Sequence, residues 1–255
     1  MEFLISASSD IGIKKDTNQD SVMVKSFSTP SGKMAFAVLC DGMGGLAKGE
    51  LASTDTIKAF ENWFRFQFPY LLRDGINESD IRKQWNSIVT LQSKKIMDYA
   101  YGLNLNMGTT IVAGLFTQDR YFIMNVGDSR GYLISDDIHI ITKDHTVVSK
   151  EVEDGVITEE QARTDPRRNV LLQCIGASED IYPGYYFGHI EPGEVFMFCS
   201  DGFVHELSTE EMYSALNPSV LSDKNTMKVN TEFLIDIAKE RKEKDNISVI
   251  LVKTC

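Results

Sequence analysis

The sequence predicts an α+β fold in which helices cover the outer faces of antiparallel sheets. Short β-branched and aromatic runs alternate with helical periodicity along the 255 residues. Two of the apolar runs end at an aspartate, Asp41 and Asp201, whereas Asp245 precedes the last run. These three carboxylates can meet at one rim only if the strands run antiparallel, because a parallel sheet puts strand ends and strand starts at opposite edges.

The composition is that of one globular domain. With 42% hydrophobic residues the chain can bury a large core, so we expect a single domain over residues 1–255. The net charge of −11 disfavours a nucleic-acid groove or an anionic membrane surface as partner. No apolar run approaches the roughly 20 residues of a membrane span. The N-terminus shows no basic leader, and the four cysteines are widely spaced without a Cys-x-x-Cys pair, so we expect a cytoplasmic protein.

The first half of the chain predicts three strands and two long helices. Residues 3–9 and 20–27 have the pattern of a pair of strands, joined by a polar loop that carries two lysines. A buried strand over residues 36–40 is followed by glycines typical of a tight turn. Apolar residues at three- to four-residue spacing predict a helix after Gly49 and another over residues 78–101. Both helices should lay one face on a sheet.

The middle of the chain predicts strands followed by a polar segment. Residues 109–116, 121–128 and 131–134 are β-branched and aromatic runs with short polar breaks, as in antiparallel hairpins. Residues 144–172 are polar and charged, which indicates a surface flap. Within it, a helix should begin at Thr158, with Gln161 three residues on as its capping partner.

The last third predicts two strands and two helices. A strand over residues 195–199 ends at Asp201, and a helix follows that is capped by Ser208 with Glu211. A further helix over residues 231–242 leads into the final strand, residues 247–252.

The aspartates at the strand ends are the candidate functional residues. Carboxylates that converge on one rim repel each other strongly unless cations lie between them. All-oxygen ligation favours Mg²⁺ or Mn²⁺ over Zn²⁺. Two such ions about 3.5 to 4 Å apart can hold and deprotonate a water for in-line attack on a phosphorus centre. For any one aspartate, the alternative is a carboxylate that only caps a turn.

A series of short motifs extends almost from end to end of the chain. In these motifs the chain resembles the metal-dependent protein phosphatases of the 2C type, in their bacterial serine/threonine phosphatase form. The resemblance implies a four-layer α/β/β/α sandwich with two central antiparallel sheets and a dimetal site at one rim. The motifs are Ser9-Asp10-Ile11-Gly12, Asn18-Gln19-Asp20, Asp41-Gly42-Met43-Gly44-Gly45, Gly49-Glu50, Met107-Gly108-Thr109-Thr110, Asn125-Val126-Gly127-Asp128-Ser129-Arg130, Lys143-Asp144-His145, Pro166-Arg167-Arg168-Asn169-Val170-Leu171, Cys199-Ser200-Asp201-Gly202 and Asp245-Asn246-Ile247-Ser248.

The resemblance also implies a role for each metal ligand. Asp41 would bridge two core ions, Mn²⁺ or Mg²⁺, and the backbone carbonyl of Gly42 would bind one of them. Asp201 and Asp245 would complete the site of the other ion, and Asp20 would act through a metal-bound water.

Two further parts of the chain are assigned by the resemblance. Asp128 would join Asp201 in holding a third, weaker ion found in bacterial members. Residues 145–171 would form the family's mobile flap, which bears on substrate choice.

Two positions depart from the family pattern. The family places an arginine that grips the substrate phosphate where this chain has Lys15. The predicted catalytic residues are Asp41, Asp201 and Lys15. A lysine supplies a positive charge but cannot form the two parallel hydrogen bonds of an arginine, so Lys15 should bind phosphate more weakly than an arginine would. Lys14 is the alternative phosphate group. Leu46 stands where many bacterial members have a histidine, so the sequence does not identify the proton donor.

The histidines lie outside the predicted ligand set. We expect structural or surface roles for all four, which are His139, His145, His189 and His205.

The predicted function is a Mn²⁺- or Mg²⁺-dependent phosphatase that acts as a monomer on phosphoserine and phosphothreonine of cytoplasmic proteins and opposes a serine/threonine kinase. One alternative is a catalytically weak regulatory domain of the same fold that binds metal or phosphoprotein. Another is a phosphatase for small phosphomonoesters. Five acids in the motifs favour the enzyme, whereas Lys15 and Leu46 keep the regulatory domain open.

Overall fold

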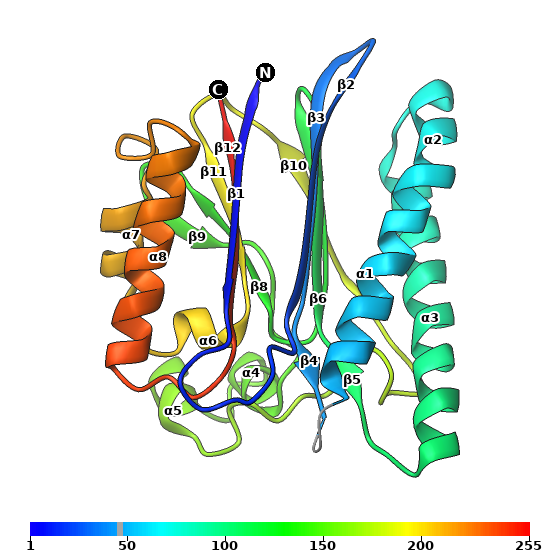
Figure 1. Cartoon of the computed structure of the whole chain (residues 1–255), viewed down its shortest axis with the longest axis vertical. Helices are drawn as coiled ribbons and strands as arrows, with labels where there is room; N and C mark the ends of the chain where they lie inside the picture. The colour runs from blue at the N-terminus through cyan, green and yellow to red at the C-terminus, as the bar shows by residue number, and fades with distance from the viewer. Residues whose placement is uncertain (45–47) are drawn as a thin grey trace.

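Two five-stranded sheets form the centre of the protein in a computed structural model that describes residues 1–44 and 48–255 (Figure 1). Every neighbouring pair of strands in them is antiparallel. Sheet A consists, in spatial order, of β1 (Phe3–Asp10), β12 (Ile247–Thr254), β11 (Val195–Cys199), β8 (Arg130–Ile134) and β9 (Ile138–Ile140). Sheet B consists, in spatial order, of β10 (Gly184–His189), β7 (Arg120–Val126), β6 (Ile111–Phe116), β3 (Gly32–Cys40) and β2 (Ser21–Thr29).

Helices cover the outer face of each sheet, which gives the four layers α/β/β/α (Figure 1). The predicted sandwich is therefore confirmed. Sheet B is covered by α1 (Gly49–Phe66), α2 (Phe68–Asp74) and α3 (Glu78–Leu103). Sheet A is covered by α7 (Thr209–Leu216) and α8 (Lys224–Glu240). At the lower rim in Figure 1 lie α4 (Val147–Glu153), α5 (Glu159–Thr164) and α6 (Asp201–Val204).

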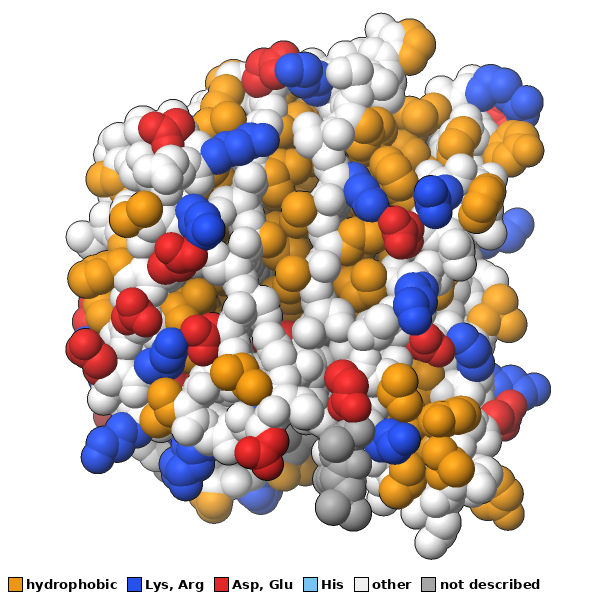
Figure 2. Space-filling model, in the orientation of Figure 1, with side chains coloured by type: hydrophobic (Ala, Val, Ile, Leu, Met, Phe, Trp, Pro, Cys, Tyr) orange, Lys and Arg blue, Asp and Glu red, His pale blue; other side chains and the backbone are white. Residues whose placement is uncertain are grey.

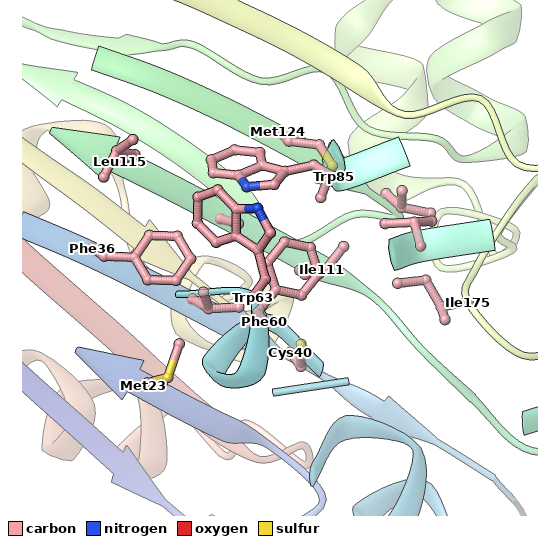
Figure 3. Close-up of a cluster of buried hydrophobic side chains, with 14 of the residues drawn as sticks. Met23, Phe36, Cys40, Phe60, Trp63, Trp85, Ile111, Leu115, Met124 and Ile175 are labelled. Carbon is pink, nitrogen blue, oxygen red and sulfur yellow. The ribbon is translucent and has the colours of Figure 1, made fainter. Parts of the chain in front are cut away.

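Strand β3 shows how the sequence builds these layers. Alternate side chains of a strand point to opposite faces. Phe36 accordingly packs against Trp63 and Trp85 of the covering helices (Figure 3), and Val38 belongs to the same buried cluster. Leu39 packs on the other face, in the layer between the two sheets. Because both faces are buried, β3 has a continuous apolar run where a half-exposed strand would alternate.

The edge strands β1 and β2 face the viewer in Figure 1, and apolar side chains fill the space between them (Figure 2). The expectation that these two strands pair with each other is wrong. β1 pairs with β12, and β2 pairs with β3. The loop between β1 and β2 carries the chain from one sheet to the other, and the local pattern of a strand-loop-strand is the same in both cases.

The same error recurs once. β6 and β7 form the predicted hairpin, but β8 after β7 joins sheet A and does not pair with β7. The glycines after Cys40 also differ from prediction. Gly42–Met43 forms a short strand, β4, which pairs with β5 (Gly108–Thr109).

The predicted helices are present, and one of them, α8, begins earlier than predicted. Both capping boxes are present, Thr158 with Gln161 on α5 and Ser208 with Glu211 on α7. Helix α8 begins at Lys224, seven residues before the predicted start, because Asp223 accepts a hydrogen bond from the Thr226 backbone and caps it. In the part of the chain that the structure describes, no helix has the length and apolar character to cross a membrane.

Candidate metal centre

Four aspartates at strand ends, Asp41, Asp128, Asp201 and Asp245, line one cleft of about 460 Å³. Asp201 follows β11 and Asp245 precedes β12, its antiparallel neighbour in sheet A. Asp41 follows β3 of sheet B, and Asp128 lies in the crossing from β7 to β8. The carboxylates therefore converge as predicted, although Asp41 comes from the opposite sheet. The end of the flap and the two residues after it supply another wall of the cleft, with Asn169, Leu171, Leu172 and Gln173.

The backbone of Asp41 is fixed by two threonines of the Met-Gly-Thr-Thr motif. The Asp41 N–H donates to Thr110 Oγ1 at 3.1 Å, and the Thr110 N–H donates back to the Asp41 carbonyl at 2.9 Å. Thr109 Oγ1 donates to the same carbonyl at 2.8 Å. The motif thus explains why the carboxylate stands at a rigid position directly after β3.

Gly42 is required by close backbone packing. A Cβ at this position would lie 2.3 Å from the carbonyl oxygen of Gly49 and 2.6 Å from that of Gln19. Both are backbone atoms that cannot rotate away. The glycine predicted as a turn residue is therefore needed for space at the contact between β4 and the start of α1.

We expect Gly42→Ala to lower the free energy of unfolding by about 2 kcal/mol or more, because inserting a methyl group against fixed backbone atoms costs that much. The measurement is urea unfolding. Gly102→Ala is the matched control: Gly102 is an exposed residue of α3 with open space around its Cβ position, so alanine there should be neutral or stabilising. Equal unfolding of Gly42→Ala and the wild type would contradict the packing argument.

Asp128 is positioned by hydrogen bonds to the turn around it. The Gly127 N–H donates to His145 Nδ1 at 3.1 Å, and the His145 N–H donates to the Gly127 carbonyl at 2.9 Å. Arg130 makes a bidentate contact with Asp144 at 3.0 and 2.7 Å. These contacts tie the β7–β8 crossing to the start of the flap, and they give His145 the structural role expected for it.

Asn246 holds the loop that carries Asp20 and Lys15. Its Oδ1 accepts from the Gln19 N–H at 2.9 Å, and its Nδ2 donates to the carbonyls of Ile11 at 2.9 Å and Thr17 at 3.2 Å. Asp20 is buried, at 8% exposure. The asparagine after Asp245 therefore acts as a clamp that brings a segment distant in sequence to the rim.

The electrostatics of the rim fit divalent cations. Both carboxylate oxygens of Asp20 and Oδ1 of Asp201 are buried without a hydrogen-bond partner. Burial and the charges of Asp201 and Asp245 raise the pKa of Asp20 to about 6. Burial, with the charges of Asp201 and Asp144, raises the pKa of Asp128 to about 8. Burial and the neighbouring aspartates raise the pKa of Asp41 well above its usual range. Hard cations would remove this repulsion and use the orphaned oxygens.

The individual ligand assignments remain predictions. Over residues 1–44 and 48–255, no three His, Cys, Asp or Glu side chains have the mutual spacing of a formed metal site. The fit therefore rests on the buried, unpartnered oxygens and on the chemistry of the donor set.

Lys15 lies at the same rim. Its Nζ is 2.8 Å from Asp245 Oδ1. Burial lowers the pKa of Lys15, but the hydrogen bond to Asp245 and the charges of Asp41 and Asp201 outweigh this and raise it above its usual value. Lys15 is therefore cationic at neutral pH. Leu46, the second position that departs from the family pattern, lies outside the described residues.

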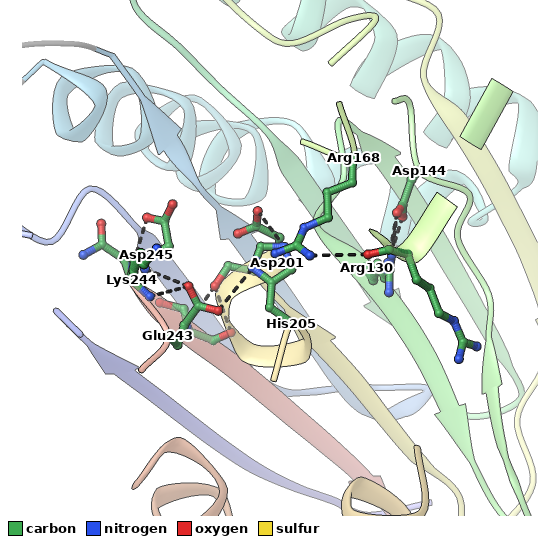
Figure 4. A network of polar contacts seen from close by, with 12 residues as sticks. Arg130, Asp144, Arg168, Asp201, His205, Glu243, Lys244 and Asp245 are labelled. Carbon is green, nitrogen blue, oxygen red and sulfur yellow. Dashed lines mark hydrogen bonds and ion pairs between the residues drawn. The ribbon is translucent and has the colours of Figure 1, made fainter. Parts of the chain in front are cut away.

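The structure reveals two site residues that the sequence analysis missed. His205 Nε2 lies 3.4 Å from Asp201 Oδ2, and His205 Nδ1 lies 3.2 Å from Glu243 Oε2 (Figure 4). Arg168 extends from the flap toward this pair (Figure 4). The i,i+4 spacing of Asp201 and His205 was a signal in the sequence, whereas nothing marked Glu243. His139 and His189 are exposed, as expected.

Fold and site together define the class: an α/β/β/α sandwich whose two sheets converge on an acidic cleft. Comparison with known proteins agrees with this class. The model of the family "Protein phosphatase 2C" matches residues 8–157. The chain therefore belongs to the protein phosphatase 2C family, in its bacterial serine/threonine phosphatase form, as its motifs predicted.

Relatives cover the whole chain, including Asp201 and Asp245 beyond the matched stretch. The serine/threonine phosphatase stp of Listeria innocua is 30% identical over 87% of this chain and 85% of its own. The structure of the S. agalactiae serine/threonine phosphatase has a TM-score of 0.85 and 30% identity, with both chains covered completely. The catalytic domain of the phosphatase PstP, solved with two manganese ions, has a TM-score of 0.77 and 28% identity and covers 98% of this chain and 97% of that one.

Proposed function

We propose that this phosphatase hydrolyses phosphoserine and phosphothreonine of proteins with two divalent cations, Mn²⁺ or Mg²⁺, held by Asp41, Gly42, Asp201 and Asp245. The observation that carries the proposal is the convergence of Asp41, Asp128, Asp201 and Asp245 on one cleft. The buried, unpartnered oxygens of Asp201 and of the nearby Asp20 support it. The two manganese ions of the PstP structure support the choice of metal. Asp20 would add a ligand through water, and Asp128 with Asp201 would hold a weaker third ion.

Such cations, when bound, polarise water and a phosphoryl oxygen. The chain's own residues supply the frame for this chemistry. Thr109 and Thr110 hold Asp41 opposite the sheet A carboxylates. Lys15 would place its positive charge beside the substrate phosphate. The substrate chain would be contacted from the end of the flap and the two residues after it, by the amide side chains of Asn169 and Gln173 and the apolar Leu171 and Leu172.

The partners follow from this activity. We propose phosphorylated proteins as substrates, a serine/threonine kinase as the enzyme that supplies them, and a monomeric, cytoplasmic phosphatase. Support for phosphorylated proteins as substrates comes from relatives named as a serine/threonine phosphatase and as a protein phosphatase. The net charge of −11 disfavours nucleic acid as a partner.

The test is hydrolysis of a phosphothreonine peptide with Mn²⁺, with Mg²⁺ and with a chelator, in the wild type and in Asp201→Asn. Turnover that requires metal and is lost in Asp201→Asn is the expected result. No turnover by folded protein that binds Mn²⁺ would favour the regulatory domain. Turnover of small phosphate esters in preference to phosphopeptides would favour the small-molecule phosphatase.

We expect Lys15→Arg to lower KM for a phosphomonoester by roughly three- to tenfold, because a guanidinium binds phosphate through two parallel hydrogen bonds. The measurement is steady-state kinetics at saturating Mn²⁺. Lys14→Arg, an exposed neighbour with the same charge, is the control and should change KM little. An unchanged or higher KM in Lys15→Arg, or a drop only in Lys14→Arg, would count against Lys15 as the phosphate group.

A further inference from the structure

Glu243 joins two parts of the rim. It lies in the loop between α8 and β12 and is only 6% exposed. Its Oε1 accepts the backbone N–H groups of Lys244 at 2.6 Å and Asp245 at 2.9 Å. Its Oε2 faces His205 Nδ1 at 3.2 Å. One buried carboxylate thus fixes the backbone of Asp245 with one oxygen and contacts the His205 ring with the other.

His205 continues the connection to Asp201. Its Nε2 lies 3.4 Å from Asp201 Oδ2, and the side chain is 16% exposed. Because both ring nitrogens face carboxylates, neither is directed at the cleft as a metal ligand. A continuous series of contacts therefore runs from the Asp201 carboxylate through His205 and Glu243 to the backbone of Asp245 (Figure 4).

The two loops that carry this connection are themselves tied down. Lys242, directly before Glu243, has a φ of 70°, a left-handed conformation that a lysine rarely adopts. Arg241 Nη1 donates to the Glu206 carbonyl at 2.6 Å and to Glu211 Oε2 at 2.8 Å. The loop after α8 is thereby held against the loop after α6, and Glu243 is directed inward.

We propose that His205 and Glu243 form a clasp that sets the separation of Asp201 and Asp245 and so the affinity for the cation these two carboxylates share. The proposal rests on the two-metal site proposed above. Residues that orient metal ligands typically change metal affinity by roughly ten- to a hundredfold when they are removed. His205 and Glu243 are positioning residues here, since they act through Asp201 and Asp245. Asp41 would bridge both ions, and Gly42 would bind only the other one. Among the described contacts, neither residue forms a hydrogen bond or ion pair with His205 or Glu243.

The test is calorimetric titration with Mn²⁺ together with electron paramagnetic resonance of the loaded protein. We expect His205→Ala and Glu243→Gln to weaken one Mn²⁺ site by roughly ten- to a hundredfold, to leave the other unchanged and to reduce the signal of the spin-coupled Mn²⁺ pair at limiting metal. His205→Gln, whose amide group keeps two N–H donors, should recover part of the loss. The matched controls are His139→Ala on β9 and Glu210→Gln on α7, both exposed.

Each outcome bears on one proposal. Wild-type protein that binds no Mn²⁺ would overturn the two-metal site itself. Wild-type affinities in both His205→Ala and Glu243→Gln would overturn the clasp and leave the metal site standing. An equal loss at both sites with a lower melting temperature, or no recovery in His205→Gln, would show a merely structural role and would also overturn the clasp.

Discussion

Asp41→Asn is expected to reduce Mn²⁺-dependent turnover of a phosphothreonine peptide by at least about a thousandfold, because two cations lose the carboxylate they share and with it several kcal/mol of transition-state stabilisation. The asparagine keeps the shape of the side chain. The hydrogen bonds of the Asp41 backbone to Thr109 and Thr110 do not involve the carboxylate, so the local fold should survive. The comparison is kcat/KM of the variant and the wild type at the same free Mn²⁺.

The same substitution should stabilise the metal-free protein. Burial and the charges of Asp20 and Asp201 raise the pKa of Asp41 well above its usual range, so its ionised form is unfavourable without a cation. We therefore expect a higher melting temperature in chelator for Asp41→Asn than for the wild type. Asp98→Asn, at an exposed position of α3, is the control and should change neither quantity. Near-normal turnover, or a lower melting temperature in chelator, would contradict the assignment of Asp41.

The convergence of the carboxylates could be predicted because the sequence pattern shows at which end of its strand each aspartate lies, and in an antiparallel sheet the end of one strand lies beside the start of the next. Apolar runs that end at Asp41 and Asp201 and one that begins after Asp245 are all visible in the chain. The sequence pattern could not predict which strands share a sheet. The crossings from β1 to β2 (residues 11–20) and from β7 to β8 (residues 127–129) each join two strand-like runs through a polar segment, as a hairpin loop does, yet each connects the two stacked sheets. Local pattern cannot separate these two cases.

One physical reason explains why His205 and Glu243 could not be identified as site residues from the sequence. His205 and Glu243 act through contacts between segments some forty residues apart, and neither interrupts the periodicity of its surroundings. Thr110 and Asn246 belong to motifs that the resemblance identified, but only the structure shows what these two side chains do. They hold Asp41 and the Asp20 loop by hydrogen bonds to backbone groups that no sequence pattern identifies.

The metal-free protein should lose stability as the pH rises from about 6.5 to 8, whereas the Mn²⁺-loaded protein should not. Burial and neighbouring carboxylates raise the pKa of Asp128 to about 8, far above its value in the unfolded chain. In this interval the folded state therefore binds more protons than the unfolded state, and the free energy of unfolding falls with pH by up to about 1.4 kcal/mol per pH unit for one such group. Asp20, with a pKa raised to about 6, contributes mainly below this range.

His145 sets the lower limit, about pH 6.5, of the pH range over which stability should fall. Burial lowers the pKa of His145 below 6.5, so its protonation destabilises the folded state only at more acid pH, where it would oppose the trend. Melting temperatures between pH 6.5 and 8, in chelator and in saturating Mn²⁺, test the prediction. Because metal displaces protons from these carboxylates, stabilisation by Mn²⁺ should grow with pH. Asp128→Asn should make the fall in chelator shallower without removing it, because the pKa of Asp41 is raised as well. A melting temperature in chelator that rises with pH would mean that the carboxylates are not crowded together, and the cation site would lose its physical basis.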